Sequence, residues 1–297
     1  MYRPTVSIIT VNYNQAHVTC ALLRSIQQYA PHNTEVIVID NCSAEPIEPI
    51  LREQFPKVVC ISSPHNRGFA GGNNLGIMAA KGKYLLFLNN DTEITSGMIE
   101  TLLAAFSRLP DAGIVCPKIC YFEPPRLIQY VGYTEMNPYT ARNTTVGNGE
   151  PDQGQYNNTM RTHYAHGAAM MLPRSVVDKV GMMPECFFLY YEELDWCEQI
   201  KRAGYGIYVE PNAVVYHKES VSVGRNSPFK TYYITRNRIL FMRRNAATKL
   251  RLLLFYAFML LFALPKNLFS FAIHREPQHA RAFLRGILWH INPSYTY

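Results

Sequence analysis

The sequence predicts an α/β protein whose central, Rossmann-like sheet is mostly parallel and flanked by helices. Apolar runs of strand length alternate with segments in which apolar residues recur at helical spacing, which is typical of βαβ units. Each of the clearest apolar runs stops at an amide or a carboxylate, as expected where parallel strands end at a ligand crevice. These runs cover residues 6–11, 35–39 and 84–88, and they end at Asn12, Asp40 and Asn89.

The first part of the chain predicts its elements in a simple order. The apolar residues Leu22, Leu23 and Ile26 share one face of the first expected helix. Ser96 suits the N-cap of the last expected helix, because its hydroxyl can accept a backbone N–H. Between these three strands we expect helix 16–29, helix 47–54, strand 58–62, a Gly/Asn loop and helix 74–80. After the third strand we expect a helix from residue 96.

The second part predicts fewer regular elements. Residues 121–165 are rich in Tyr, Asn, Thr, Pro and Gly, and we expect long loops there with a short antiparallel hairpin. Regular structure returns with a strand over 167–172, a helix from about residue 175, a helix over 192–204 and a strand over 207–216 that ends at His217.

The composition narrows the choice of partners. The chain has 297 residues, 48% of them hydrophobic, and a net charge of +7. This charge suits nucleic acid, anionic lipid or a phosphorylated small molecule, but nucleic-acid binding does not explain the acids at the strand ends, so we expect none. The seven cysteines include no CxxC pair. We therefore expect reduced core cysteines in a cytosolic protein rather than a zinc site.

The tail from about residue 228 changes character and predicts a second region, 228–297, after a main domain over 1–227. Basic residues precede an apolar run over 252–264, which Pro265 interrupts. This run is too short for the ~20 residues that cross a bilayer, so we expect a helix lying in a membrane surface. A core or dimer-interface helix is the alternative. The N-terminus carries no apolar signal segment, so export is not expected.

Two stretches near the strand ends suggest ligand contacts. Asp40 can accept N–H groups of a nucleobase or hydroxyls of a ribose, although Asp-Asn-x-Ser is also ordinary turn chemistry. The stretch 66–74 contains three glycines before a helix N-terminus, and its backbone N–H groups suit a phosphate or a sugar hydroxyl. It matches neither GxGxxG nor a P-loop, and a tight turn with an Asn cap explains it equally well.

Two further stretches carry carboxylates. The sequence Asn89-Asn90-Asp91 ends a strand, and Mg²⁺ or Mn²⁺ often takes one carboxylate together with substrate phosphates; a capped turn is the alternative. Three acids, Glu192, Glu193 and Asp195, fall in the first turn of an expected helix. Either they are structural, because the helix dipole stabilises negative charge there, or one of them provides a general base. His217 adds a nitrogen ligand at a strand end.

In this order the stretches resemble glycosyltransferase family 2, with its GT-A fold, and most closely the rhamnosyltransferase-like branch. The matching stretches are 6–14, 36–43, 66–74, 85–92, 167–172, 188–204 and 214–217. The resemblance implies that Asp40, Asn12 and Asn14 form a nucleotide pocket. It places the ribose and donor sugar beside Asn66, Gly68, Gly71, Gly72, Asn73 and Asn90. It assigns a divalent cation, Mg²⁺ or Mn²⁺, to Asp91, Asn89 and His217.

The same resemblance implies an inverting sugar transfer. Glu193 occupies the position of the family's Asp base with one extra methylene, and this lengthening leaves room for Glu192 or Asp195 to take part. Asn89 replaces the first acid of the DxD-type metal motif. Arg236-Asn237 resembles a pair found after the catalytic domain in the family, with no role assigned.

The implied donor is a nucleoside diphosphate sugar, UDP- or dTDP-linked, because uracil and thymine present the same edge to Asp40. The implied acceptor is a hydroxyl of a growing, lipid-linked cell-surface glycan at the inner face of a bacterial cell membrane, where the enzyme is peripheral. The alternative is a catalytically degenerate, nucleotide-binding or scaffolding member of a glycan-assembly complex. The transferred sugar, with rhamnose as one candidate, and the oligomeric state stay open.

Overall fold

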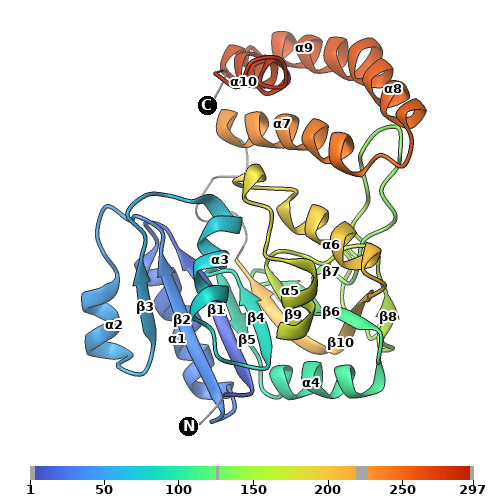
Figure 1. Ribbon diagram of the computed structural model, residues 1–297. Helices are drawn as coiled ribbons and strands as arrows, with labels where there is room; N and C mark the ends of the chain where they lie inside the picture. Colours follow the sequence, from blue (N-terminus) through green and yellow to red (C-terminus); the bar gives the residue numbers. More distant parts are fainter. Residues whose placement is uncertain (1–3, 125–126, 219–226, 295–297) are drawn as a thin grey trace.

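The computed structural model describes residues 4–124, 127–218 and 227–294. They form one sheet of ten strands in the order β3-β2-β1-β4-β9-β6-β10-β5, with β7 beside β6 and β8 beside β10. Strands β1, β2, β3, β4, β6 and β10 share one direction, whereas β5, β7, β8 and β9 oppose it. Helices flank this sheet, so the predicted mostly parallel α/β class is confirmed (Figure 1).

The bounds of the elements are as follows. The strands are β1 (Val6–Asn12), β2 (Thr34–Asp40), β3 (Val59–Ser62), β4 (Tyr84–Leu88), β5 (Thr92–Ile94), β6 (Ala112–Tyr121), β7 (Ile128–Tyr130), β8 (Met160–Arg161), β9 (Ala169–Pro173) and β10 (Gly206–His217). The helices are α1 (Ala16–Tyr29), α2 (Glu48–Gln54), α3 (Gly68–Ala79), α4 (Met98–Arg108), α5 (Arg174–Val180), η1 (Glu185–Phe187), α6 (Glu192–Arg202), α7 (Pro228–Asn245), α8 (Lys249–Phe258), η2 (Met259–Ala263), α9 (Leu264–Ile273) and α10 (Pro277–Leu288).

Two helix starts differ from the sequence prediction. Helix α3 begins at Gly68 rather than at Asn74, so the expected Gly/Asn loop is the first part of a helix. Helix α4 begins at Met98, and Ser96 makes no side-chain cap bond. The chain turns instead through Gly97 in a left-handed conformation, φ +74°, because glycine adopts this region without a steric penalty.

One central strand was absent from the prediction. Strand β6 pairs with both β9 and β10, but Pro117 and Lys118 interrupt its apolar pattern. Pro117 is tolerated here because β10 bulges opposite it, between Glu210 and Val214. Lys118 is buried and pairs with Asp152 at 2.5 Å. The sheet is therefore continuous across a stretch whose composition does not indicate a strand.

The middle of the chain follows its prediction more closely. Between residues 121 and 165, of which 125 and 126 lie outside the described residues, regular structure is limited to the short strands β7 and β8. Strand β7 returns antiparallel against β6, which confirms the short hairpin. The expected strand over 167–172 is β9, and it lies antiparallel between β4 and β6.

The tail forms a layer of helices above the sheet domain (Figure 1). Helices α8, η2 and α9 form one helix over 249–273, the one helix among the described residues that is long and apolar enough to cross a membrane by length and composition alone. The prediction that this run is too short is therefore wrong. Pro265 does not end the helix, since a π-helical turn, η2, precedes it and changes the hydrogen-bond register there.

The cysteines are reduced throughout the described residues. Five of them are buried or half-buried, as predicted. Cys42 and Cys186 are exposed, so the expectation of core positions is wrong for these two. Cys42 lies in the loop after β2, and Cys186 lies in the short helical turn η1, at the surface of the molecule.

Candidate active site

A chain of hydrogen bonds joins the polar residues at the carboxyl ends of β1, β2 and β4. Asn90 donates to the hydroxyl of Thr19 over 3.1 Å, and this hydroxyl donates to Oδ1 of Asn12 over 2.8 Å. Asn12 in turn donates to Oδ1 of Asp40 over 3.4 Å. All four residues are more than nine-tenths buried. The strand-end amides and Asp40 are therefore brought together, as the parallel pairing of β1 with β2 and β4 requires.

Asp40 also shapes the loop that follows it. Its Oδ1 accepts the backbone N–H of Ser43, and its Oδ2 accepts that of Ile47, just before α2. The turn chemistry considered for this residue is thus realised in the structure. Binding of a nucleobase stays a prediction: Oδ1 already accepts two hydrogen bonds, whereas Oδ2 accepts one and could accept another.

Asn14 lies farther out than Asn12. Asn14 is exposed, and its backbone adopts the left-handed conformation, φ 54°. Its Oδ1 accepts the backbone N–H of Ala44. It lines a cavity of about 670 Å³ between α1 and α2. Neither Asp40 nor Asp91 lines this cavity, so we do not assign the donor to it.

The glycines of α3 lie against protein atoms. A Cβ on Gly68, φ +69°, would lie 2.1 Å from the carbonyl oxygen of Phe188, and one on Gly72 would lie 2.9 Å from Cγ1 of Val11. A Cβ on Gly71 would meet the Arg67 side chain at 2.6 Å. Close helix packing therefore explains these glycines by itself, and contact with a donor sugar stays a prediction.

Two asparagines hold the start of α3. Oδ1 of Asn66 accepts the N–H of Gly68 and the amide of Asn41. Asn73, one helical turn into α3, donates to the carbonyl oxygen of Phe69. Both side chains therefore stabilise the helix start, and Asn66 also contacts Asn41, which follows Asp40 directly.

Asp91 and His217 form a second buried centre at the same edge, each 6% exposed. Nδ1 of His217 lies 2.7 Å from Oε1 of Gln129, an acceptor, so Nδ1 carries the hydrogen. In a neutral ring, Nε2 then presents a lone pair 3.1 Å from Oδ1 of Asp91. That oxygen has no hydrogen-bond partner in the described residues. A protonated ring would donate to this oxygen as an ion pair, whereas in the neutral ring two lone pairs face each other and the two side chains can serve as ligands of one cation.

The donor set agrees with a divalent cation. Carboxylate oxygen and imidazole nitrogen are both common ligands of such ions. In the described part of the chain, no three His, Cys, Asp or Glu side chains gather around one point, so other ligands would come from substrate or water. Asn89 is half-buried beside the pair, whereas Asn90 is committed to Thr19.

His166 completes this corner, and the sequence did not single it out. Its ring lies edge-on to that of His217, with centroids 6.1 Å apart, and it stacks on Tyr133. Burial and then the neighbouring His217 lower the pKa of His166 to about 3, against the opposing effect of Asp91. Its position directly before a predicted strand, next to Gly167, was the available signal.

The three acids of α6 differ in their surroundings. Glu193 is half-buried, and burial raises its pKa to about 7. Glu192 is 2% exposed, and its Oε2 has no hydrogen-bond partner among the described residues. Burial, followed by repulsion from Glu193, raises the pKa of Glu192 well above its ordinary value. Of the two, Glu193 is the one poised to accept a proton near neutral pH.

Asp195 is fully buried and fully engaged. Nε and Nη2 of Arg244 contact its two oxygens at 3.0 and 3.1 Å, and Asn245 and Gln199 donate to it at 2.6 and 2.8 Å. This set of donors anchors α6 to α7. The sequence grouped Asp195 with the catalytic acids, but its lone pairs are occupied, so we leave it out of the proposed chemistry.

The loop over 185–191 brings α6 to the site in a strained conformation. Phe188, Tyr190 and Tyr191 have φ of 66°, 70° and 74°, a region that costs side-chain-bearing residues free energy. The amide of Asn237, which is fully buried, donates to the carbonyl oxygens of Phe187, Leu189 and Tyr190 at 2.7–2.9 Å.

Arg236, which precedes Asn237, adds further hydrogen bonds to the same loop. The guanidinium of Arg236 donates to the carbonyl oxygens of Cys186 and Phe187 and to Oδ1 of Asn237. The Arg-Asn pair, to which the sequence gave no role, therefore holds the 185–191 loop. Only tertiary contacts reveal this, since about fifty residues separate the pair from the loop.

The predicted gathering of Asp40, Asp91 and Glu193 at one rim is supported by this series of contacts. The polar chain leads from Asp40 to Asn90, the neighbour of Asp91, and Asp91 contacts His217. From His166, beside His217, the chain continues to Gly167, where an added Cβ would lie 3.9 Å from Cδ of Glu193. The carboxyl ends of β1, β2, β4 and β10 and the start of β9 thus meet at one edge.

Comparison with known proteins places this geometry in a family. The model of Glycosyl transferase family 2 matches residues 7–181. A hexosyltransferase of low-salt glycan biosynthesis from Haloferax volcanii, Agl10, is 28% identical over 242 residues, which cover 79% of this chain and 74% of the relative. The N-acetylglucosaminyl-diphospho-decaprenol L-rhamnosyltransferase of Mycobacterium tuberculosis is 25% identical, with 74% and 78% covered.

Solved structures support the fold. The mannosyltransferase PcManGT from Pyrobaculum calidifontis, in complex with GDP-Man and Mn²⁺, superposes with a TM-score of 0.58 at 15% identity, covering 99% of this chain and 88% of that one. GalNAc-T7 with UDP, GalNAc and Mn²⁺ gives 0.62 at 16% identity, although this chain spans only 48% of its length. The architecture is the GT-A fold, and with the match over 7–181 the chain belongs to glycosyl transferase family 2.

Proposed function

We propose that this protein transfers a sugar, with rhamnose as one candidate, from a UDP- or dTDP-linked donor to a hydroxyl of a lipid-linked glycan, with inversion at the anomeric carbon. The observation that carries the proposal is the placement of Glu193, with a pKa of about 7, at the same rim as the facing Asp91 and His217. A general base and a cation site are the two parts that a single-displacement transfer needs. The relatives named above act on hexoses and on a diphospho-decaprenol acceptor.

In the proposed reaction, Glu193 takes the proton of the acceptor hydroxyl as this oxygen bonds to the anomeric carbon, and the bond to the departing diphosphate breaks. Asp91 and His217 would hold Mg²⁺ or Mn²⁺. When bound, such an ion neutralises the charge that grows on the diphosphate. Gln129 contacts Nδ1 of His217, which orients the ring so that Nε2 faces Oδ1 of Asp91, where the two would hold such an ion. No covalent intermediate with the protein is required.

A pair of substitutions tests both parts. Glu193→Gln and Asp91→Ala should each lower turnover at least ~100-fold. Glu193→Gln should leave donor binding in place, whereas Asp91→Ala should also weaken Mn²⁺-dependent binding of UDP. Near-normal transfer by either folded variant would refute the corresponding role. Metal-dependent hydrolysis of the donor by the unsubstituted protein separates an enzyme from a nucleotide-binding scaffold, because a scaffold shows none.

The tail is proposed to contact a membrane on the inner face of the cell. Leu260, Leu261 and Phe262 on the 249–273 helix are 64%, 64% and 63% exposed, and an exposed apolar face of this kind marks a lipid or protein contact. Replacing all three by Ser should abolish flotation with anionic liposomes. Met78→Ser, which removes an equally exposed apolar side chain elsewhere, should not. Flotation that survives the triple change would refute the membrane contact.

A further inference from the structure

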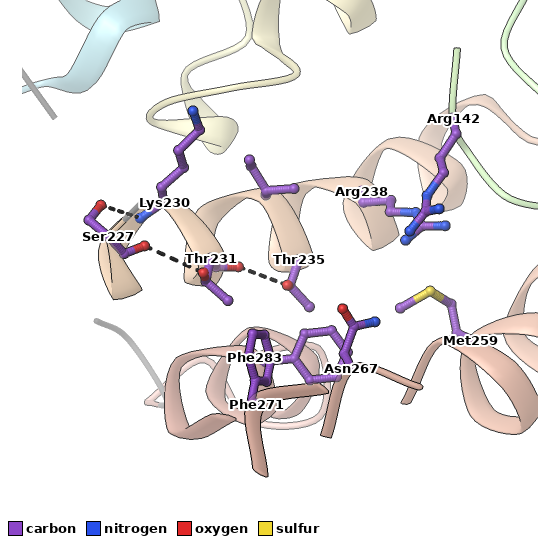
Figure 2. A pocket seen from close by; sticks show the side chains of 11 residues that line it. Arg142, Ser227, Lys230, Thr231, Thr235, Arg238, Met259, Asn267, Phe271 and Phe283 are labelled. Carbon is purple, nitrogen blue, oxygen red and sulfur yellow. Dashed lines mark hydrogen bonds between the residues drawn. The ribbon is translucent and has the colours of Figure 1, made fainter. Parts of the chain in front are cut away.

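A cavity outside the catalytic rim has walls of two kinds. It measures about 280 Å³ and lies between α7 and the helices that follow it in the tail (Figure 2). Arginine, serine and threonine side chains line one part, and the apolar side chains of Ile234, Met259, Phe271 and Phe283 line another. A ligand that fits both parts carries a polar or charged group joined to hydrocarbon.

The polar wall carries positive charge that no acid in the described part of the chain balances. Arg142, from the loop before β8, and Arg238, from α7, extend toward each other (Figure 2). Among the residues that the structure describes, no carboxylate lines the cavity, and neither arginine forms an ion pair with any of them. Arg238 is 7% exposed and donates through Nε to the carbonyl oxygen of Thr140 at 2.8 Å. Two neighbouring guanidinium groups, one of them buried, favour an anion between them.

The charges of this pair affect each other. Burial is the main cause that lowers the pKa of Arg238 to about 10; Tyr191 opposes this shift, and the neighbouring Arg142 adds to it. The guanidinium of Arg142 makes no hydrogen bond to any residue that the structure describes, and the residue is exposed. It is therefore available to a ligand, whereas Arg238 is held in place by Thr140.

The cavity adjoins the 185–191 loop, which precedes Glu192 and Glu193. The hydroxyl of Tyr191 donates to the carbonyl oxygen of Ala141, between Thr140 and Arg142. Lys230, whose stem lines the cavity, extends its ammonium toward the 185–191 loop, 5.9 Å from the ring centre of Tyr190 (Figure 2). Tyr190 and Tyr191 thus separate the cavity from the acids that follow them. A sugar attached to an anion in the cavity would extend past these tyrosines toward Glu193.

The apolar wall adjoins the tail helix with the exposed face. Met259 and Phe271 belong to the 249–273 helix, as do the exposed Leu260, Leu261 and Phe262. A hydrocarbon chain leaving the cavity along this helix would stay on apolar surface. The two guanidinium groups, the apolar cavity wall and the exposed apolar face of the helix therefore follow one another, as the phosphate and the hydrocarbon chain of a lipid phosphate require.

We propose that this cavity binds the diphosphate of the acceptor's isoprenoid carrier between Arg142 and Arg238, with the carrier's first isoprene units against Phe271 and Phe283. The proposal rests on the proposed transfer to a lipid-linked glycan and specifies where that acceptor is held. It assigns these side chains to binding and gives them no part in the displacement.

The test measures binding rather than turnover. Farnesyl diphosphate, farnesol and inorganic diphosphate are titrated separately against the full-length protein by calorimetry, in EDTA. Farnesyl diphosphate should bind more tightly than either of the others, because only it fills both walls. Arg142→Gln should weaken its binding at least ~10-fold, and Arg142→Lys should retain most of it. Lys57→Gln, which removes an exposed charge elsewhere, should have no effect.

The outcomes separate this proposal from the proposed catalytic function. Binding of farnesyl diphosphate that Arg142→Gln leaves unchanged would overturn the site, as would equal binding of farnesol. Asp91→Ala should leave farnesyl diphosphate binding intact, since the cation centre lies elsewhere, and loss of binding in this variant would place the ligand at the donor site instead. If transfer activity fails while these affinities behave as expected, the proposed reaction fails and the lipid phosphate site remains.

Discussion

Asp40 ends strand β2, and Asp91 follows strand β4. Glu193 instead follows the 185–191 loop, which contains three residues in the left-handed region and is held in place by α7, more than forty residues later in the chain. At the strand ends, the polar side chains bind one another, and residues 12 to 90 supply the whole hydrogen-bond chain. The 185–191 loop makes two backbone hydrogen bonds within itself and one to Phe69. Its carbonyl oxygens also accept the side-chain donors of Arg236 and Asn237 from α7. Both sets of contacts join residues far apart in the chain, 71 residues for Asn90 and Thr19 and 50 for Asn237 and Phe187. The comparison teaches that one rim can join a half positioned by paired strands to a half positioned by a helix outside the sheet.

This difference predicts unequal sensitivity to substitution. Changes in the helix that supports the 185–191 loop should cost more stability and more activity than changes in the strand-end chain. Four measurements can sharpen or break the comparison, beginning with the largest expected effect.

Arg244→Met should have the largest effect on stability. It leaves the buried carboxylate of Asp195 without its charged partner. The cost is about 2–4 kcal/mol, less than for a fully buried pair because the side chain of Arg244 is 40% exposed. Urea unfolding measures this loss. The double variant Arg244→Met with Asp195→Asn removes the charge as well and should recover a large part of it. If the single change costs less than 1 kcal/mol, α6 does not depend on this anchor.

Asn237→Asp should come second. It keeps the shape of the side chain but removes the amide that donates to three carbonyl oxygens, and leaving buried acceptors unpaired costs about 1–3 kcal/mol. Because Glu193 follows the same loop, turnover should fall about 10–100-fold, as small displacements of a base are costly. Thermal unfolding and steady-state kinetics on the purified variant give both numbers. Normal turnover at reduced stability would show that these hydrogen bonds support the fold alone.

The pH profile is the third measurement. With a pKa of about 7 for Glu193, kcat/KM should fall tenfold per pH unit below neutrality, because only the ionised base accepts a proton. The folded state binds this proton more tightly than the unfolded chain does. Stability should therefore decrease as pH rises from about 4.5 to 7. Glu193→Gln should flatten the pH dependence of the melting temperature over this window, and an unchanged slope would contradict the raised pKa.

Thr19→Val should have the smallest effect. It removes one hydroxyl from the strand-end chain while Asn12 keeps its bonds to Ser43 and Asp40. A loss of about 1 kcal/mol and a less than tenfold change in turnover are expected, measured as for Asn237→Asp. A larger loss than that of Asn237→Asp would reverse the comparison between the two halves.

Much of the first half could be predicted because its signals are local. Helix α1 has the predicted bounds, and strands β1, β2 and β4 end at the polar residues that marked them. The errors arose where a side chain serves a distant neighbour. Gly68 and Gly72 were assigned to a loop because glycine usually favours loops, yet they allow α3 to approach the 188 carbonyl and β1 closely. Strand β6 was missed because a bulge in β10 accommodates Pro117.

The tail shows the same limit. Proline interrupts an apolar run in the sequence, but a π-helical turn lets the helix continue through Pro265. Asp195 looked equivalent to Glu192 and Glu193 in the sequence, and only the arrival of Arg244 and Asn245 from α7 separates their roles.

By itself, the sequence determined the α/β class and the order along the chain of the strands that carry the acids, because hydrophobic periodicity and strand-end polarity are properties of neighbouring residues. The family followed from the resemblance of its motifs to glycosyltransferase family 2, not from these local patterns. The tertiary structure alone decided which acid has a pKa near neutrality, which histidine nitrogen faces Asp91 and what holds the strained loop. Those properties depend on burial and on partners distant in the chain, and no local pattern specifies the electrostatic surroundings that folding creates.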